Sequence, residues 1–324
     1  MKTSRLLLLA ALLALAAFPA AAQITDTYSI PASANARGAF GTHWKTRLSI
    51  FNPHLTHALR VSITLLRTGG VSGGDDDEWM IDIPANSLAY SDNILEDLFE
   101  VDSGTGSLLV ATFAEDNQGV PNTITDRAFL VTSNTFNDHP SGTYGQTIPG
   151  VWTGLLNYGT DQISSVAHDI RNTGVWRTNV GAVNLGRCNV EVVLAVYNAD
   201  GETVAEGIRL HVPPLGHIQD RLPTAISNGS VEFFVIDPCV ESDEDYAVVF
   251  PYTSTIDQRS GDPTYQSPVL LAPPNILYAK GQQSDPTRIG KKLDSEVARN
   301  VRANVQRRGV ANLVREAKGW RIAQ

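Results

Sequence analysis

The residues best suited to bind a metal fall in two short stretches of this 324-residue sequence. In the first, His54 and His57 follow Asn52-Pro53, a pair that is typical of a turn. The two imidazoles could approach one another there. Zinc, however, takes four ligands in most protein sites, and the neighbouring sequence offers no third. We therefore interpret the stretch as a solvated turn and predict no zinc site.

The second stretch, Asp75-Asp76-Asp77-Glu78, is the densest run of carboxylates in the sequence. Clustered oxygens bind calcium, and extracellular calcium is abundant enough to fill weak sites. The run lacks the Asp-x-Asp-x-Asp-Gly spacing that directs carboxylates at one ion, so we favour a solvated loop tip whose charges repel one another. These four residues are a weak calcium candidate, and no other cofactor is predicted.

Motifs for nucleophilic or phosphate chemistry are missing from the sequence. No Gly-x-Ser-x-Gly precedes a helix, and no Gly-x-x-x-x-Gly-Lys-Ser/Thr occurs. A carboxylate pair for glycoside cleavage can form from distant positions, so the sequence leaves that chemistry open. Four aromatic residues could form a sugar-stacking platform, although such side chains more often pack in a core: Trp79, Trp152, Tyr158 and Tyr265.

The N-terminus is organised like a secretory signal. Met1-Lys2-Thr3-Ser4-Arg5 is positively charged, and the apolar run over residues 6–18 is too short for a comfortable membrane span. Ala20-Ala21-Ala22 then supplies the small residues of a cleavage site. We expect residues 1–22 to be removed and the protein to be exported to the periplasm, the extracellular space or the cell surface. An uncleaved N-terminal anchor is the alternative.

Cys188 and Cys239 are the two cysteines of the sequence. An even number in an exported chain indicates a disulfide. The bridge would lie within the second half of the chain and stabilise the fold by roughly 4 kcal/mol in the chain-entropy model. Two buried free thiols are the alternative.

Charge divides the chain into an acidic body and a basic end. The whole sequence carries 25 Lys and Arg residues against 34 Asp and Glu residues. From Lys280 onward there are 11 basic and 4 acidic residues, which leaves the body beyond the signal with 12 basic and 30 acidic ones. A body this acidic repels nucleic acid and anionic lipid, so we predict no nucleic-acid partner.

The basic end has its own apolar pattern, with a spacing of four residues: Ile289, Leu293, Val297, Val301 and Val305. The polar face of the segment is rich in Arg, so residues 276–324 are predicted to form a basic, partly helical, amphipathic tail. Gly309 and Gly319 interrupt it. Such a tail could dock on the acidic body, lie on an anionic surface or bind a partner.

The candidate binding residues must be positioned by the folded elements of the chain, and two similar stretches of sequence indicate how these elements are organised. Trp44-Lys45-Thr46-Arg47-Leu48-Ser49-Ile50-Phe51-Asn52 is matched by Trp176-Arg177-Thr178-Asn179-Val180-Gly181-Ala182-Val183-Asn184. Each begins with Trp, a cation and Thr, continues as an alternating strand and ends with Asn. Further markers follow in the same order, namely Pro84 and Pro213, Gly106 and Gly229, Tyr144 and Tyr265. We infer two copies of one folding unit, anchored by Trp44, Thr46 and Asn52 and by Trp176, Thr178 and Asn184.

Alternating apolar residues and frequent turns predict an all-β fold. The run Leu59, Val61, Ile63, Leu65 is typical of a half-buried strand. About six or seven short strands per copy predict two tandem antiparallel β-sandwiches over residues 23–150 and 151–275. We expect them to pack end to end around residues 149–159. Residues 23–43 and 163–173 are expected to be lead-ins without regular structure, and residues 92–99 to form one or two helical turns.

The pattern resembles repeated domains of secreted bacterial proteins, mostly of unassigned function. Those domains share a Trp-Arg-Thr strand, a strand that ends in Pro and a late Gly-Thr-Tyr-Gly-Gln. The first copy here has Trp44, Thr46, Pro84 and Gly142-Thr143-Tyr144-Gly145-Gln146. The second departs from the pattern at its end, with Asp262-Pro263-Thr264-Tyr265-Gln266. The resemblance covers roughly residues 30–273 and implies a fold and a compartment, but no activity.

These observations favour a non-enzymatic exported protein with a structural, adhesive or ligand-binding role. Its partner would be a surface glycan or a protein. A secreted hydrolase acting on polysaccharide is the alternative, and it would need two carboxyl groups in one aromatic-lined cleft. A third possibility is a partner-binding protein that acts through its basic tail.

Overall fold

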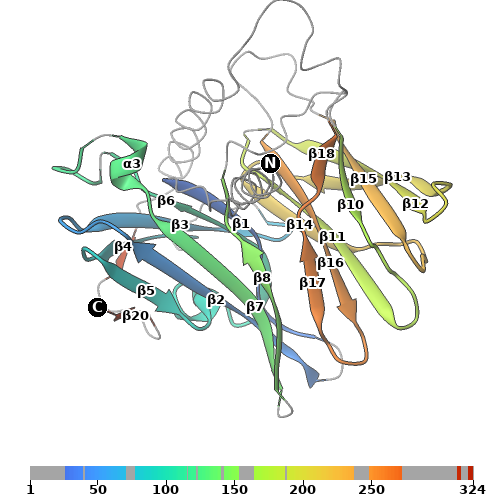
Figure 1. Ribbon diagram of the computed structural model, residues 1–324, viewed down its shortest axis with the longest axis horizontal. Coiled ribbons are helices and arrows are strands. Elements are labelled where there is room, and N and C mark those ends of the chain that lie inside the picture. Colours follow the sequence, from blue (N-terminus) through green and yellow to red (C-terminus); the bar gives the residue numbers. More distant parts are fainter. Residues whose placement is uncertain are drawn as a thin grey trace, which may run out of the picture.

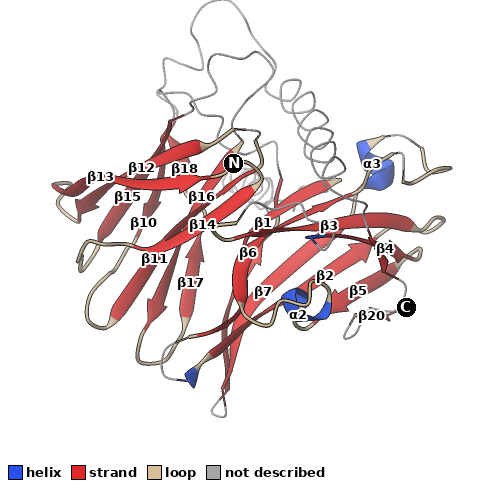
Figure 2. Ribbon diagram, turned by 180° about the vertical axis from the view of Figure 1, so that it is seen from behind, coloured by secondary structure: helices blue, strands red, loops and turns tan. Residues whose placement is uncertain are grey.

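The computed structural model describes residues 26–38, 41–70, 77–114, 116–121, 123–139, 142–152, 164–186, 188–236, 248–271, 312–314 and 320–323. Most of these residues lie in β-strands, and the fold is all-β as predicted (Figure 2). Two helices of a single turn are described, α2 (Ile94–Asp97) and α3 (Ile124–Arg127). The first was expected from its apolar spacing. None of the helices in the described ranges is long and apolar enough to cross a membrane.

Nine strands are described in the first half of the chain. They are β1 (Thr27–Arg37), β2 (His43–Asn52), β3 (Leu59–Arg67), β4 (Glu78–Ile83), β5 (Ser87–Ser91), β6 (Gly104–Ala111), β7 (Leu130–His139), β8 (Gly142–Pro149) and β9 (Val151–Trp152). One set of neighbours is β4-β3-β6-β1, with β9 on the far side of β1, and the other is β5-β2-β7-β8. The long strand β1 joins the two sets, because its end also pairs with β2. A bulge between Ile30 and Ser33 accompanies this change of partner.

The second half also contains nine strands. They are β10 (Ser164–His168), β11 (Trp176–Asn184), β12 (Val190–Asn198), β13 (Thr203–Val212), β14 (Gly216–Arg221), β15 (Gly229–Ile236), β16 (Val249–Asp257), β17 (Pro263–Gln266) and β18 (Val269–Leu271). Their two sheets have the orders β13-β12-β15-β10-β18 and β14-β11-β16-β17. These orders match those of the first half strand for strand. Figure 1 shows the two halves beside one another.

Hydrogen bonds of individual side chains follow the same parallel. Thr46 faces Thr135 across β2 and β7, with 2.8 Å between the hydroxyl oxygens. Thr178 faces Thr255 across β11 and β16, with 2.9 Å between theirs. All four threonines are buried. A hydroxyl pair in a core satisfies both groups at once, which explains why Thr recurs at this place in each copy.

The terminal asparagines of β2 and β11 hold the same turn. The side-chain amide of Asn52 donates to the carbonyls of His57, Ile83 and Pro84. That of Asn184 donates to the carbonyls of Cys188, Val212 and Pro213. In each case the side-chain oxygen accepts the N–H of the residue two positions on. Asn is required because a single side chain must both donate and accept.

The late tyrosines do not correspond in the same way. Thr135 of the first half pairs with Gln146, whereas Thr255 of the second half pairs with Thr264. Tyr144 and Tyr265 are therefore out of register by three residues. The sequence marker suggested by these tyrosines was wrong because a short motif can slide along a strand without disturbing the pairing.

Two hydrophobic cores account for the burial. One lies between the two sheets of the second half and includes Val180, Val192, Leu194 and Phe233. The other begins in the first half, with Ile30, Leu48, Ile63 and Leu108, and extends into the second through a further set of residues: Val183, Leu185, Leu215, Val248, Phe250 and Tyr252. The junction of the halves is thus part of a core. It is more extensive than the end-to-end contact that we expected around residues 149–159.

The outer face of the β14-β11-β16-β17 sheet forms this junction. Alternate residues of a strand point to opposite faces, so Val180 and Ala182 enter the core of the second half while Val183 turns toward the first. Tyr252 lies opposite Gly181, where a Cβ atom would come within 2.3 Å of the phenol ring. Glycine at this position lets the ring lie flat across the strand and reach the other half.

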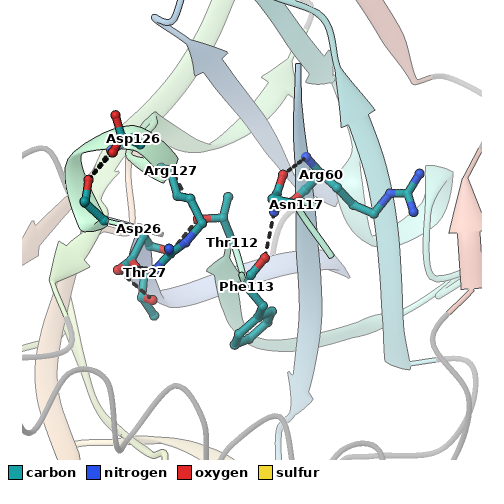
Figure 3. Close-up of polar contacts among 9 residues, drawn as sticks. Asp26, Thr27, Arg60, Thr112, Phe113, Asn117, Asp126 and Arg127 are labelled. Atoms are coloured by element: carbon teal, nitrogen blue, oxygen red, sulfur yellow. Dashed lines mark hydrogen bonds and ion pairs between the residues drawn. The ribbon is translucent and has the colours of Figure 1, made fainter. Parts of the chain in front are cut away.

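A buried ion pair closes the opposite end of the first half. Asp26 contacts Arg127 at 3.0 Å, and the two side chains point toward one another in Figure 3. Burial raises the pKa of Asp26 despite the adjacent guanidinium. Thr112 also donates to the Arg127 carbonyl, and Asn117 bonds the backbone of Arg60 in both directions. These contacts fix the long connection between β6 and β7.

Three sequence expectations about elements were wrong. Both expected lead-ins contain strands, β1 and β10, because runs of small and β-branched residues fit a sheet without strong alternation. Strand β3 is buried along most of both faces instead of one. Residues expected in the tail helix form β19 (Asn312–Val314), which pairs with β4. A further strand, β20 (Arg321–Ala323), pairs with β5. Most of the predicted tail helix lies outside the described residues.

Candidate functional site

A cavity of about 400 Å³ lies between the two halves. Its first-half wall comes mainly from β1, β2, β7 and β8: Ala32, Ala34, Ala36, Trp44, Thr135, Gln146 and Ile148. Its second-half wall comes from β11, β14 and β16: Arg177, Asn179, Gln219, Arg221, Ser254 and Ile256. This volume falls in the range of small-molecule sites, which often form where two structural units meet.

Strand register explains the second-half wall. Asn179 on β11 lies between Arg221 on β14 and Ser254 on β16. Arg177 lies two residues earlier on the same face and opposite Ile256. Because side chains directly opposite one another share a face, all five line one surface. That surface is the part of the junction sheet that the apolar contacts around Tyr252 do not fill.

Small side chains leave the cavity open on the other wall. Ala32, Ala34 and Ala36 alternate along β1 and place only methyl groups on the face toward the cavity. Trp44 pairs with Ala36 and contributes the one aromatic ring of the lining. The halves touch again beside the cavity, where the Gln146 amide donates to the Ser254 hydroxyl at 3.1 Å.

A chain of hydrogen bonds crosses the junction near the cavity. The Thr68 hydroxyl lies 2.7 Å from that of Thr105 and 2.6 Å from Nδ1 of His217. Nε2 of His217 lies 2.7 Å from the Tyr252 hydroxyl, which donates to Oε1 of Gln219 at 2.8 Å. Because the Tyr252 hydroxyl donates its hydrogen to Gln219, it can only accept from His217. A neutral imidazole therefore donates from Nε2 and accepts at Nδ1.

This arrangement keeps His217 neutral. The side chain is fully buried, and burial lowers its pKa to about 3. The hydrogen-bond partners of the ring, Thr68 and Tyr252, are neutral, so a buried imidazolium would lose its hydration without gaining a counter-charge. Both ends of the chain, Thr105 and Gln219, line the cavity. Since Oε1 of Gln219 is held by Tyr252, its amide N–H groups remain to face a ligand.

Positive charge gathers at the cavity although the body of the protein is acidic. Arg37, Arg177 and Arg221 line it, and Asp220 is the single carboxylate among its lining residues. Burial and the neighbouring Arg221 both lower the pKa of Arg177. The lining can therefore attract anions and donate hydrogen bonds. One carboxylate does not form the pair that glycoside cleavage needs.

The two rings of the histidine pair are held by the backbone of a neighbouring connection. The rings of His54 and His57 are stacked with centroids 4.3 Å apart. Each donates through Nε2 to a backbone carbonyl, His54 to Ala128 and His57 to Asp126, both at 2.9 Å. His54 and His57 are half-buried against the connection before β7, while Leu55 and Thr56 between them are exposed, so the predicted turn is solvated in part. Within the described residues, no three potential ligands gather into a metal site.

The acidic run is also less exposed than expected. Asp75 and Asp76 lie outside the described residues. Asp77 is buried and contacts Arg67 at 2.7 Å, while Glu78 is buried and accepts a hydrogen bond from Ser62. The prediction of a solvated loop tip was wrong for these two residues, because pairing partners on β3 outweigh the cost of burial.

The candidate aromatic platform does not assemble. Trp79 and Tyr265 both pack against the larger core, and the Tyr265 ring stacks on Tyr252 at 5.8 Å. Tyr158 and the Trp152 side chain lie outside the described part of the structure. Trp44, expected only as a packing anchor, lines the cavity, while Trp176 lies under the guanidinium of Arg171.

Only one of the two cysteines of the predicted disulfide lies among the described residues. Cys188 precedes β12, whereas Cys239 lies outside the described residues. The bridge therefore stays a prediction.

Sequence reasoning missed most of the cavity. Strands β5 and β14 were not predicted, and β14 supplies Gln219 and Arg221. The alternating alanines of β1 were the one available signal, since small residues at every second position indicate space on one face of a strand. Comparison with known proteins adds no relative: no family model matches the sequence, and no curated protein matches it.

Proposed function

We propose that this chain is an exported, non-enzymatic ligand-binding protein built from two tandem β-sandwich modules. The ligand is held in the cavity between the modules. The single observation that carries this proposal is that both halves contribute polar and cationic side chains, and the first half an aromatic ring, to one cavity of ligand size. A purely structural or adhesive role gives no reason to leave such a space inside a junction that is otherwise closely packed.

Duplication of one folding unit is supported by the shared strand order, the paired threonines and the Asn52 and Asn184 turns. Export is proposed from the signal-like residues 1–22.

The disulfide between Cys188 and Cys239 is proposed from the strand register as well as from the expected compartment. Glu191 pairs with Ile236 across β12 and β15, and each cysteine lies three residues beyond that pair, so a continued ladder would place them opposite one another.

The alternative, a secreted hydrolase acting on polysaccharide, has less support at this cavity because a second carboxylate does not line it. The basic tail remains a possible partner-binding segment. Its deletion from Gln282 to Gln324 should leave ligand binding in the cavity unchanged, because the residues of that segment that the structure describes, 312–314 and 320–323, do not line it.

A cavity-filling variant tests the proposal. We expect purified protein to gain thermal stability from at least one class in a panel of neutral sugars, acidic sugars and amino acids. Ala36→Phe should abolish that gain by occupying the cavity. Val204→Phe is the matched control, since Val204 is exposed on β13, away from the junction. Equal stabilisation of wild type and Ala36→Phe by the same compound would contradict binding at this site.

A further inference from the structure

Arg177 is held in surroundings that disfavour its charge. It lies on β11, half-buried, and its Nε atom is buried without a hydrogen-bond partner. Its pKa is lowered first by burial and then by Arg221. A guanidinium stays protonated at physiological pH, so the ligand-free protein carries the cost of this charge. Within the described part of the chain, no carboxylate forms an ion pair with Arg177.

The neighbouring groups on the cavity wall also favour a negatively charged ligand. Arg221 lies opposite Asn179, two residues from Arg177 on the shared face. Asp220, the one carboxylate of the lining, accepts the backbone N–H of Arg221 at 2.7 Å. On the other side, Gln219 lines the cavity and has its oxygen occupied by Tyr252, which leaves the N–H donors of its amide outside that bond. Two guanidinium groups and an amide donor on one wall form a site for an oxyanion.

We propose that the cavity binds a small organic molecule through a negatively charged oxygen group, a carboxylate or a phosphate, held between Arg177 and Arg221. This inference rests on the proposed function and specifies its ligand class. The uncharged part of the molecule packs against Trp44 and the alanine methyl groups of β1. Binding places a negative charge between the half-buried Arg177 and the exposed Arg221, where hydrogen bonds between charged groups are stronger than neutral ones.

One consequence can be measured without any ligand. Arg177→Gln removes an unpaired charge from the cavity wall and keeps an amide donor. We expect the ligand-free variant to melt about 2–4 °C higher than wild type, because a charge retained for binding costs stability. Arg209→Gln is the control. Arg209 is exposed on β13 and ion-paired with Glu191, so its replacement should leave the melting temperature unchanged or slightly lower. A lower melting temperature for Arg177→Gln would overturn the proposal.

The ligand class is tested by calorimetric titration of the full chain with sodium glucuronate, glucose and inorganic phosphate. We expect at least tenfold tighter binding of glucuronate or phosphate than of glucose. Arg177→Gln and Arg221→Gln should each weaken that binding at least tenfold, and Arg209→Gln should not. Tighter glucuronate than phosphate binding assigns a carboxylate, and the reverse assigns a phosphate.

The two proposals fail in different ways. If glucose binds as tightly as glucuronate and Ala36→Phe abolishes both, the cavity is a ligand site but the anion inference is wrong. If neither anion binds to wild type, the anion inference is wrong as well. If an anion binds equally to wild type, Arg177→Gln and Ala36→Phe, its site lies elsewhere and both proposals fail.

Discussion

At the residue scale, the junction depends on polar side chains with one workable arrangement of protons. His217 accepts from Thr68 and donates to Tyr252, so its ring must be neutral and of one tautomer. At the position of the first half that matches His217 in register, the residue is Leu88. The same strand position thus carries an apolar residue in one half and a buried imidazole in the half whose sheet faces the junction.

Acid should therefore destabilise the junction through His217. The folded-state pKa of about 3 lies below the unfolded value of about 6.5, so the unfolded chain binds the proton first as the pH falls. Stability is lost from about pH 6.5 downward, by about 2–3 kcal/mol between pH 7 and pH 4.5. Urea unfolding at pH 7 and at pH 4.5 measures this loss of stability.

His217→Leu is the matching variant for that measurement. It should be less stable than wild type at pH 7, because Thr68 and Tyr252 lose a partner. It should also lose about 2–3 kcal/mol less stability between pH 7 and pH 4.5. An identical pH dependence in wild type and variant would show that His217 does not titrate in this range.

The turn asparagines support a second prediction at this scale. Asn52→Ala and Asn184→Ala should each cost about 2–4 kcal/mol of unfolding free energy, because three carbonyls and one N–H lose their partner in a buried site. Asn189, exposed before β12, is the control, and Asn189→Ala should cost less than about 0.5 kcal/mol. Chemical denaturation measures all three. A large effect at Asn52 with none at Asn184 would contradict equivalent roles in the two halves.

At the element scale, two-faced strands explain how one sheet serves two interfaces. β11 sends Val180 and Ala182 into the core of the second half, while Arg177, Asn179 and Val183 face the first. The corresponding face of the first half, on β2 and β7, carries polar residues such as Arg47 and Asn134 and forms an open groove. One strand pattern thus gives either a solvated surface or a junction, according to the residues on its outer face.

The link between β12 and β15 supports a prediction about the cysteines. Reduction, or Cys188→Ser, should lower the stability of the protein by roughly 4 kcal/mol if the chain-entropy model holds. Intact mass before and after reduction and alkylation measures bridge formation directly, and thermal melts measure its effect. Alkylation of both thiols without prior reduction would mean that the bridge does not form.

At the scale of the whole molecule, the continuous core makes the two halves depend on one another. Phe250, Tyr252 and Leu215 belong to the second half but lie in the core of the first. Burying each such side chain contributes about 1.5–3 kcal/mol. Residues of both halves line the cavity, so neither half forms it alone.

We therefore expect residues 23–275 to unfold in one cooperative transition. A fragment of residues 160–275 should bind a hydrophobic dye and associate, because the junction face is then exposed. Phe250→Ser with Tyr252→Thr should make that fragment less prone to associate while destabilising the full chain. Calorimetry and analytical ultracentrifugation measure these outcomes, and two separate transitions in the full chain would contradict the shared core.

The local sequence pattern was sufficient to predict the strands in which apolar and polar residues alternate or that end at a strong turn signal. The strands around Thr46, Val61 and Thr178 were predicted because one face of each is apolar and the other is less so. Strand β14 was missed because His217, Gln219 and Arg221 face another module, so polar residues take the places where an apolar face was expected. Strand β1 was missed because its alanines leave space instead of filling it.

The sequence by itself determined the all-β class and the positions of the anchoring Thr and Asn residues, because strand periodicity and turn chemistry are local properties of the chain. Only the tertiary structure decided that the second sheet packs its outer face on the first half, and that Arg177, Arg221 and Trp44 share one cavity. The physical reason is that these side chains come from strands far apart in sequence. Their meeting depends on how two folded units dock, which no local spacing encodes.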